Sequence, residues 1–173
     1  MAHINVIPRQ PGDGIENWQD MVARIRQLPH VTAVSPALYS PTFLKGPLQS
    51  KGAYIKGVDP TSELALSGTL RRLKAGSVDR LRDAGANPPG ILLGSRLAED
   101  LGMRVGDNIE LITDEMLPVG IRPVTRRFKV CGVFETGFFE IDDNWAYLAM
   151  GAAQKALSVD QINQIELNVD DLN

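Results

Sequence analysis

The stretch from Ile91 to Leu111 constrains the fold most, because a strand, a helix and a second strand follow one another closely in it. Ile91-Leu92-Leu93 is a short apolar run, which is typical of a buried strand. Ser95 is predicted to cap a helix, and Gly102 to end it in a left-handed conformation. This helix is expected to bury three apolar residues, Leu97, Ala98 and Leu101. Short elements of both kinds favour an α+β fold.

Two alternating segments that follow predict a long β-hairpin. Ile109 to Thr113 and Arg127 to Phe134 each alternate apolar and polar residues with the two-residue period of a strand. The segment between them, Asp114 to Thr125, is predicted to be a loop. Pro118 and Pro123 lie within it, and because proline lacks an amide donor, we expect the ladder of hydrogen bonds to stop there.

This loop is apolar where a long hairpin tip is ordinarily polar. Its apolar residues are Met116, Leu117, Val119, Ile121 and Val124. Two alternatives are open. Either these side chains fold back onto the core of the domain, or the loop projects as a stiff apolar finger that meets a partner with little loss of conformational freedom.

Basic residues lie at the base of the loop. Arg126, Arg127 and Lys129 are candidates to attract an acidic patch on a partner. The alternative is that Arg127 or Lys129 pairs with Glu110 on the neighbouring strand, which is a common arrangement on a solvated sheet face.

The first third of the chain predicts a strand, a helix and a meander. Residues 4–7 read as a strand, and the apolar spacing from Ile15 to Leu28 predicts a helix that Pro29 ends. Three strand-like segments follow, with a break at Pro41 between the first two: residues 31–39, 42–48 and 53–58. Asp59-Pro60 predicts a boundary between two lobes, each smaller than an average domain.

The last third predicts three more short elements. Residues 145–148 read as a strand, residues 151–157 as a helix, and residues 162–169 as a terminal strand with alternating apolar residues. Together with the composition, 43% hydrophobic and 23% charged, these elements predict an ordinary folded domain.

No catalytic or metal-binding constellation is found in the sequence. The two histidines, His3 and His30, exclude a three-histidine metal site, and Cys131 is expected to be buried within a strand. Asp142-Asp143 is predicted to form a turn before a strand. We therefore expect no cofactor and no metal, and we predict that the chain is not an enzyme.

Net charge and the lengths of the apolar runs exclude further classes of protein. A net charge of -3 with scattered basic residues argues against binding to nucleic acid. No apolar run is long enough to span a bilayer, and residues 1–6 lack the regions of a signal peptide. We expect the chain to be a segment of a larger protein.

Several segments together resemble the lipoprotein-releasing, or Lol-type, subunits among the MacB-like and FtsX-like ABC transporter permeases. The first runs from Ile91 to Gly102 and continues from Val105 to Leu111. The remaining matches are Gly57-Val58-Asp59-Pro60, Phe128 to Gly137, Asp142, Trp145-Ala146-Tyr147 and Ala153-Gln154. The resemblance extends over nearly the whole chain.

The resemblance implies a periplasmic domain of two subdomains on the outer face of the bacterial inner membrane. Residues 1–59 with 158–173 would form the membrane-proximal, porter-like subdomain. Residues 60–157 would form an inserted, sabre-like subdomain with mixed and antiparallel strands, short helices and a protruding β-hairpin loop. A partner permease subunit and a cytoplasmic ATPase would act through membrane segments outside this chain.

The resemblance also implies a binding site for a periplasmic lipoprotein carrier chaperone, which delivers lipoprotein cargo. In such permeases a proline-containing hook recruits the chaperone, and this sequence has similar residues at that place: Leu117, Pro118, Val119, Gly120, Ile121, Arg122 and Pro123. Thr125 and Arg126 would be the polar and basic residues beside the hook. Glu110 departs from the pattern, because a basic residue is expected there.

Two other functions are consistent with the sequence. A MacB-type efflux or FtsX-type mechanotransmission domain would bind an adaptor or a cell-wall enzyme, and it would not need prolines or apolar residues at the hairpin tip. A free enzyme with an unrecognised site is the other alternative.

Overall fold

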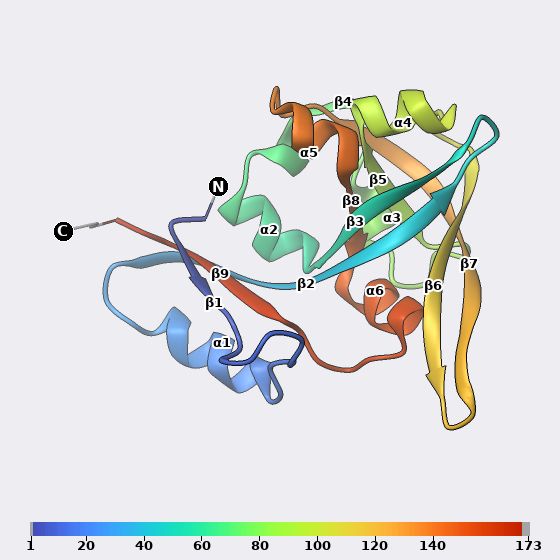
Figure 1. The fold of residues 1–173 in the computed structure, drawn as a ribbon. Coiled ribbons are helices and arrows are strands. Elements are labelled where there is room, and N and C mark those ends of the chain that lie inside the picture. The colour runs from blue at the N-terminus through green and yellow to red at the C-terminus, as the bar shows by residue number, and fades with distance from the viewer. Residues whose placement is uncertain (1, 171–173) are drawn as a thin grey trace.

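The computed structural model describes residues 2–170, and a single mixed sheet organises them (Figure 1). Its strands are β1 (Ile4–Val6), β2 (Val31–Lys45), β3 (Ser50–Val58), β4 (Leu73–Gly76), β5 (Gly90–Gly94), β6 (Asn108–Leu117), β7 (Gly120–Phe134), β8 (Trp145–Ala149) and β9 (Gln164–Val169). The helices are α1 (Trp18–Arg26), α2 (Pro60–Leu66), α3 (Asp79–Arg82), α4 (Ser95–Leu101), α5 (Phe139–Asn144) and α6 (Met150–Leu157), with a 3₁₀ turn, η1, at Thr69–Arg71. The predicted α+β class is confirmed.

Six of the strands close into a ring. The strand order runs β2, β3, β8, β5 and β7, and β6 pairs with both β7 and β2. The β3–β8 and β5–β7 pairs are parallel, and the other pairs in the ring are antiparallel. Every strand of the ring contributes to one apolar core, through Leu44, Ile55, Leu148, Leu93, Phe128 and Ile109. The ring therefore holds the base of the β6–β7 hairpin on both edges.

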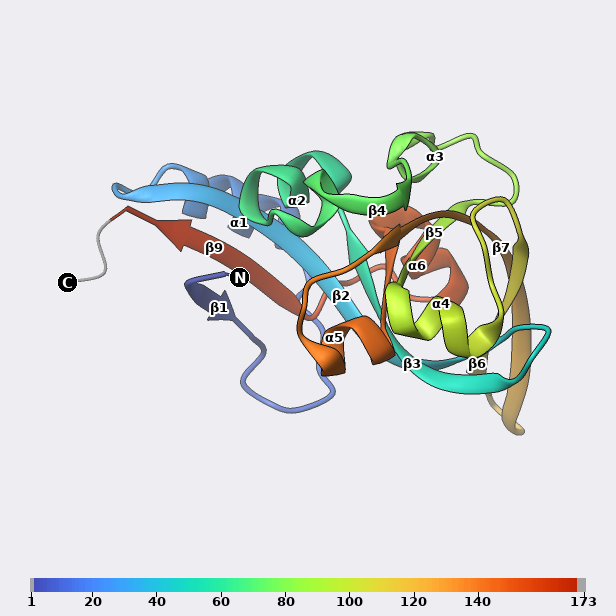
Figure 2. The same cartoon turned by 90° about the horizontal axis from the view of Figure 1, so that it is seen from above.

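A second, smaller apolar cluster lies beside the main core. Its buried members are Val58, Leu70, Leu81, Leu92, Phe134 and Tyr147. Leu81 of α3 belongs to this cluster and Leu64 of α2 packs against it, and these two helices follow one another along the same side of the molecule (Figure 2). Val22 of α1 belongs to the main core instead. These short elements bury little area individually, so the sheet must supply most of the apolar contacts that order them.

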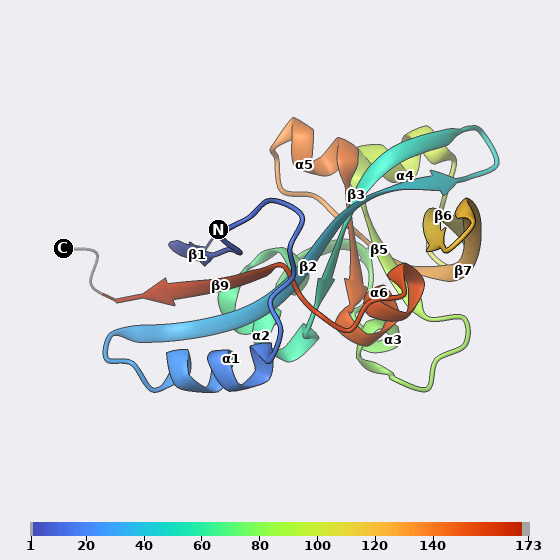
Figure 3. The same ribbon diagram turned by 60° about the horizontal axis from the view of Figure 1, so that its bottom comes forward.

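The strand β9 lies between β1 and β2, which brings the last described strand back beside the first (Figure 3). β1 and β9 lie at this end of the molecule, and the hairpin lies at the opposite end (Figure 1). The division into 1–59 with 158–173 and 60–157 stays a prediction. Within residues 2–170, no helix combines the length and the apolar character that crossing a membrane requires.

The predicted break at Pro41 is wrong, because β2 continues from Val31 to Lys45. On one edge β2 pairs with β9 only as far as Ala37, and with β6 only from Phe43 onward. Pro41 lies between these limits with β3 as its single neighbour. A proline is tolerated there because one edge of the strand is open.

The first helix is shorter than its apolar spacing predicts. Asn17 has a φ of 50°, in the left-handed region, so the chain turns immediately before Trp18. Ile15 is buried through a bridge to Ile162 rather than on the helix. Leu28 lies beyond the end of α1 and is exposed.

Ser95 is the first residue of α4 and not its cap, so that prediction is wrong. Gly94 holds the capping position without a side-chain hydrogen bond, because β5 runs directly into the helix. A Cβ on Gly94 would approach the carbonyl oxygen of Asp142 to 2.3 Å, which explains the glycine. Gly102 ends α4 with a φ of 72°, as predicted.

The predicted turn at Asp142-Asp143 is a short helix, α5. The buried Asp142 carboxylate accepts hydrogen bonds from the Thr136 amide (2.7 Å), the Thr136 hydroxyl (2.8 Å) and the Gly137 amide (3.0 Å). Asp143 pairs with Lys51 at 2.7 Å. Both acidic side chains are thus used to hold neighbouring segments in place.

Candidate partner-binding hairpin

The hairpin of β6 and β7 remains paired to its tip, so the predicted loop from Asp114 to Thr125 is wrong. The register continues without interruption to Leu117 opposite Gly120, and only Pro118 and Val119 form the turn. Pro123 pairs with Asp114 at a place where β7 has no second neighbour. Its missing donor is tolerated on this two-stranded ribbon, because the outer edge is open.

The tip conformation explains its proline and glycine. Pro118 takes the first central position of the turn, where its fixed φ fits the common turn types. Gly120 has a φ of 137°, a region that side chains rarely adopt, although a Cβ there would meet nothing within 4 Å. The backbone conformation, rather than a lack of space, requires glycine at this position.

The hairpin tip exposes an apolar surface. Val119 is 94% exposed, Met116 82% and Ile121 66%, so for these three side chains the alternative of folding back onto the core is wrong. Met116 and Ile121 are directly opposite each other in the register and therefore share one face of the ribbon. We call Met116, Val119 and Ile121 the tip patch.

Arg122 is already engaged within the hairpin. Its Nη2 atom lies 2.8 Å from Glu115 Oε2, and its Nε donates to the same oxygen at 2.8 Å. The two residues are cross-strand partners. Such an exposed pair contributes about 1 kcal/mol or less. Arg122 thus has a partner within the hairpin, whereas the apolar side chains of the tip patch are exposed to solvent.

The two residues predicted beside the hook project to opposite faces. Thr125 and Arg126 are neighbours on β7, and neighbouring strand residues alternate in direction. Thr125 therefore shares a face with Ile121 and Arg127, whereas Arg126 does not. All of these side chains are exposed. A partner that contacts the face of the ribbon carrying Ile121 is therefore expected to contact Thr125 and Arg127 rather than Arg126.

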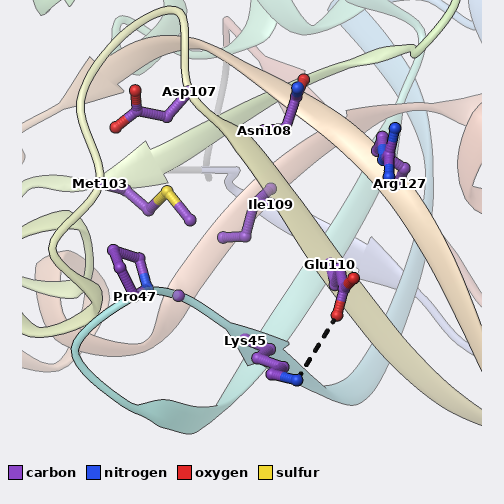
Figure 4. A pocket seen from close by; sticks show the side chains of 9 residues that line it. Lys45, Pro47, Met103, Asp107, Asn108, Ile109, Glu110 and Arg127 are labelled. Carbon is purple, nitrogen blue, oxygen red and sulfur yellow. Dashed lines mark ion pairs between the residues drawn. The ribbon is translucent and has the colours of Figure 1, made fainter.

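Glu110 pairs with Lys45 on β2, at 3.9 Å, and not with Arg127 or Lys129, so the alternative of an ion pair with β7 is wrong. Both residues line an open groove of about 570 Å³ at the base of the hairpin (Figure 4). Arg127 and Asn108 lie along the same groove, with Met103 and Pro47 on its apolar wall (Figure 4). The pairing with β2, which places Lys45 here, has no signal in the local sequence.

His30 and Cys131, candidates from the sequence for metal binding or reactivity, do not form a chemical site within the described residues. His30 is exposed, and its Nδ1 lies 2.9 Å from Asp170 Oδ1. Cys131 is half-buried, and burial raises the pKa of its thiol, so it stays protonated near neutral pH. Within residues 2–170, no three histidine, cysteine or acidic side chains are grouped as a metal site would need.

Comparison with known families gives a match over almost the whole chain. The model of the MacB-like periplasmic core domain family matches residues 1–172. The lipoprotein-releasing system transmembrane protein LolC of Xylella fastidiosa strain Temecula1 is 34% identical over 174 residues, which is 99% of this chain and 41% of that protein. The corresponding LolE of Haemophilus influenzae is 26% identical over 98% of this chain and 41% of its own length. The chain spans about two fifths of these relatives.

Solved structures show the same fold at low identity. The periplasmic region of MacB from Actinobacillus actinomycetemcomitans superposes with a TM-score of 0.64 at 16% identity, covering 95% of this chain and 70% of that one. The extracellular domain of the transporter YknZ from Gram-positive bacteria gives a TM-score of 0.63 at 8% identity, covering 89% and 73%.

Proposed function

Because the chain belongs to the family of MacB-like periplasmic core domains, we propose that it is the periplasmic domain of a lipoprotein-releasing ABC transporter permease. The domain would stand at the periplasmic face of the bacterial inner membrane. Its partners there would be a second permease subunit and a cytoplasmic ATPase, which act through membrane segments outside this chain. Its cargo would be a lipoprotein. The names of the LolC and LolE relatives support this reading.

The proposal assigns recruitment of a periplasmic carrier chaperone to the hairpin. The observation that carries it is the tip patch, an apolar surface held away from the domain's own core. Apolar side chains exposed on a pre-ordered hairpin bind a partner with a small conformational cost. The residues involved would be Leu117 to Pro123, with Thr125 and Arg126 beside them.

The same hairpin is suited to relay motion. β7 continues from the tip at Gly120 to Phe134 inside the core, as one strand. Below the tip it pairs with β6, and further along with β5 and β4. A displacement of the ring would therefore move the tip with it, as an ATP-driven cycle in the missing membrane part requires.

The test is a binding measurement between a purified carrier chaperone and this chain. Replacing Pro118 by alanine together with Val119→Asp and Ile121→Asp is expected to weaken binding at least about tenfold, because two charges replace apolar contact surface. Isothermal titration calorimetry measures the change.

A matched control uses exposed apolar residues away from the hairpin tip. Leu48→Asp together with Val105→Asp introduces the same two charges and is expected to leave binding unchanged. If the hairpin variant binds the chaperone as tightly as the unmodified chain, the assignment of the hook is wrong.

A further inference from the structure

A buried charged cluster lies far from the hairpin, between β3, α2 and β9. Lys56 Nζ donates to Glu63 Oε1 at 2.9 Å and to Glu166 Oε2 at 3.0 Å. All three side chains are buried. Tyr39 donates its hydroxyl to the Glu166 carboxylate, and Ser35 donates to Glu63 Oε2 at 3.3 Å. We call Lys56, Glu63 and Glu166 the buried cluster.

The buried cluster forms the floor of a cavity of about 270 Å³. Tyr39, Trp145 and Tyr147 form aromatic walls, and Phe138 stands at the cavity with 62% of its surface exposed. Tyr39 and Trp145 meet edge to face with their ring centroids 5.3 Å apart. This cavity is separate from the groove at the hairpin base, with which it shares no lining residue.

The charges that line this cavity do not balance. Lys56 is the one cationic side chain among the lining residues, and it faces two carboxylates, Glu63 and Glu166. A buried charge without a counter-charge is costly, so a further cation in the cavity would be stabilised. The more accessible of the two carboxylates is Glu166, which is 5% exposed whereas Glu63 is fully buried. Besides the bond from Lys56, the Glu166 carboxylate accepts from the Tyr39 hydroxyl and from Gln164 Nε2 at 3.2 Å.

Lys56 shows which cation these surroundings fit. Its ammonium lies 5.4 Å from the ring centroid of Tyr39 and 5.6 Å from that of Tyr147, besides contacting both carboxylates. Aromatic faces and carboxylates together bind ammonium groups, and an enclosed site strengthens the attraction by excluding water. The open part of the cavity offers the same two kinds of group.

We propose that this cavity binds a small molecule carrying a primary ammonium group, with Glu166 as its carboxylate partner and Trp145 and Phe138 as its aromatic walls. The cavity accommodates a molecule of the size of ethanolamine. This site is independent of chaperone recruitment by the hairpin, so either proposal stands if the other fails.

The two tryptophans of the chain provide the test. Trp145 lines the cavity and Trp18 does not, so their indole N–H resonances report site and background separately. Titrating the chain with ethanolammonium chloride is expected to shift the Trp145 resonance saturably and to leave that of Trp18 in place. Ethylene glycol, the neutral analogue, is expected to shift neither resonance.

Variants separate binding from folding. Glu166→Gln is expected to weaken ethanolammonium binding at least about tenfold. Because Glu166 belongs to the buried cluster, its replacement could also disturb folding. Two adjacent exposed phenylalanines therefore provide a second, independent comparison. Phe138→Ala is expected to weaken binding, whereas Phe139→Ala, which is 59% exposed but does not line the cavity, leaves it unchanged.

Three outcomes would overturn the proposal. The first is a Trp145 resonance that does not shift, or that shifts no more than Trp18. The second is equal binding by the Phe138→Ala and Phe139→Ala variants. The third is a response to an N-acetyl-lysine amide but not to ethanolammonium, which would assign the cavity to the side chain of a partner protein instead of a small molecule.

Discussion

Replacing Lys56 by methionine is expected to lower the free energy of unfolding by about 3 to 5 kcal/mol, the usual cost of removing one partner from a buried ion pair. The variant leaves Glu63 and Glu166 buried without their cation. Chemical denaturation monitored by circular dichroism measures the difference. A loss below about 1 kcal/mol would show that water or a rearrangement compensates both carboxylates.

The pH dependence gives this prediction a second check. Burial alone, the largest single influence, would lower the pKa of Lys56, but Glu63 and the other groups around the ammonium, Glu166 among them, together outweigh it, and the pKa is raised above its ordinary value. A raised pKa contributes stability that is complete below the unfolded pKa, about 10.4 for lysine, and is lost as the pH rises through the folded value. The difference in free energy of unfolding between the unmodified chain and the Lys56→Met variant should therefore be the same at about pH 7 and about pH 9. It should narrow only in stronger alkali.

A triple replacement distinguishes loss of charge from loss of packing. Changing Lys56, Glu63 and Glu166 all to methionine removes every charge of the buried cluster and keeps similar volumes. Such replacements are often neutral or stabilising. We expect this variant to be more stable than Lys56→Met alone, which would be contradicted if the two variants unfolded at the same denaturant concentration.

Asp142→Ala is expected to cost about 2 to 3 kcal/mol, because one buried carboxylate accepts all three hydrogen bonds that fix Thr136 and Gly137. Thr136 is half-buried and Gly137 exposed, so some of the freed donors can bond to water. The cost is therefore smaller than that of losing three fully buried hydrogen bonds. Asp142→Asn keeps one acceptor oxygen and should lose less. Urea titrations of both variants measure the free energies of unfolding.

The neighbouring Glu140 provides the control for this prediction. It lies on the same short helix, α5, with an exposed side chain. Glu140→Ala should change the free energy of unfolding by less than about 0.5 kcal/mol. An Asp142→Ala variant as stable as Glu140→Ala would mean that the hydrogen bonds around Thr136 contribute nothing to folding.

The elements with strong local signals were predictable from the sequence. The apolar run at Ile91-Leu92-Leu93 is the fully buried β5, and Gly102 ends the following helix in the left-handed conformation. The alternation from Ile109 and that up to Phe134 gave the paired strands β6 and β7. In each case, a few consecutive residues determine the local structure.

Features that depend on distant neighbours were not predictable. The prolines at 41 and 123 suggested breaks, but each lies where its strand has an open edge, which only the sheet order reveals. Glu110 pairs with Lys45 on β2 rather than with a residue of β7, its neighbour in the hairpin.

The buried cluster was missed for the same reason. Lys56 lies within the strand-like segment 53–58, and one of its two carboxylate partners, Glu166, is 110 positions away. The exposed tip of the hairpin was left open by the sequence, since apolar residues at 116–121 were equally consistent with burial. Only the three-dimensional arrangement distinguishes these alternatives.

Site-specific photo-cross-linking in the assembled transporter tests the central claim most directly. With a benzophenone amino acid in place of Val119, irradiation in the presence of the carrier chaperone is expected to join the two proteins, because the side chain at the turn is the most exposed of the tip patch. The same probe in place of Leu48, which is also well exposed, should give no adduct. An adduct from position 48 and none from position 119 would contradict recruitment through the hairpin.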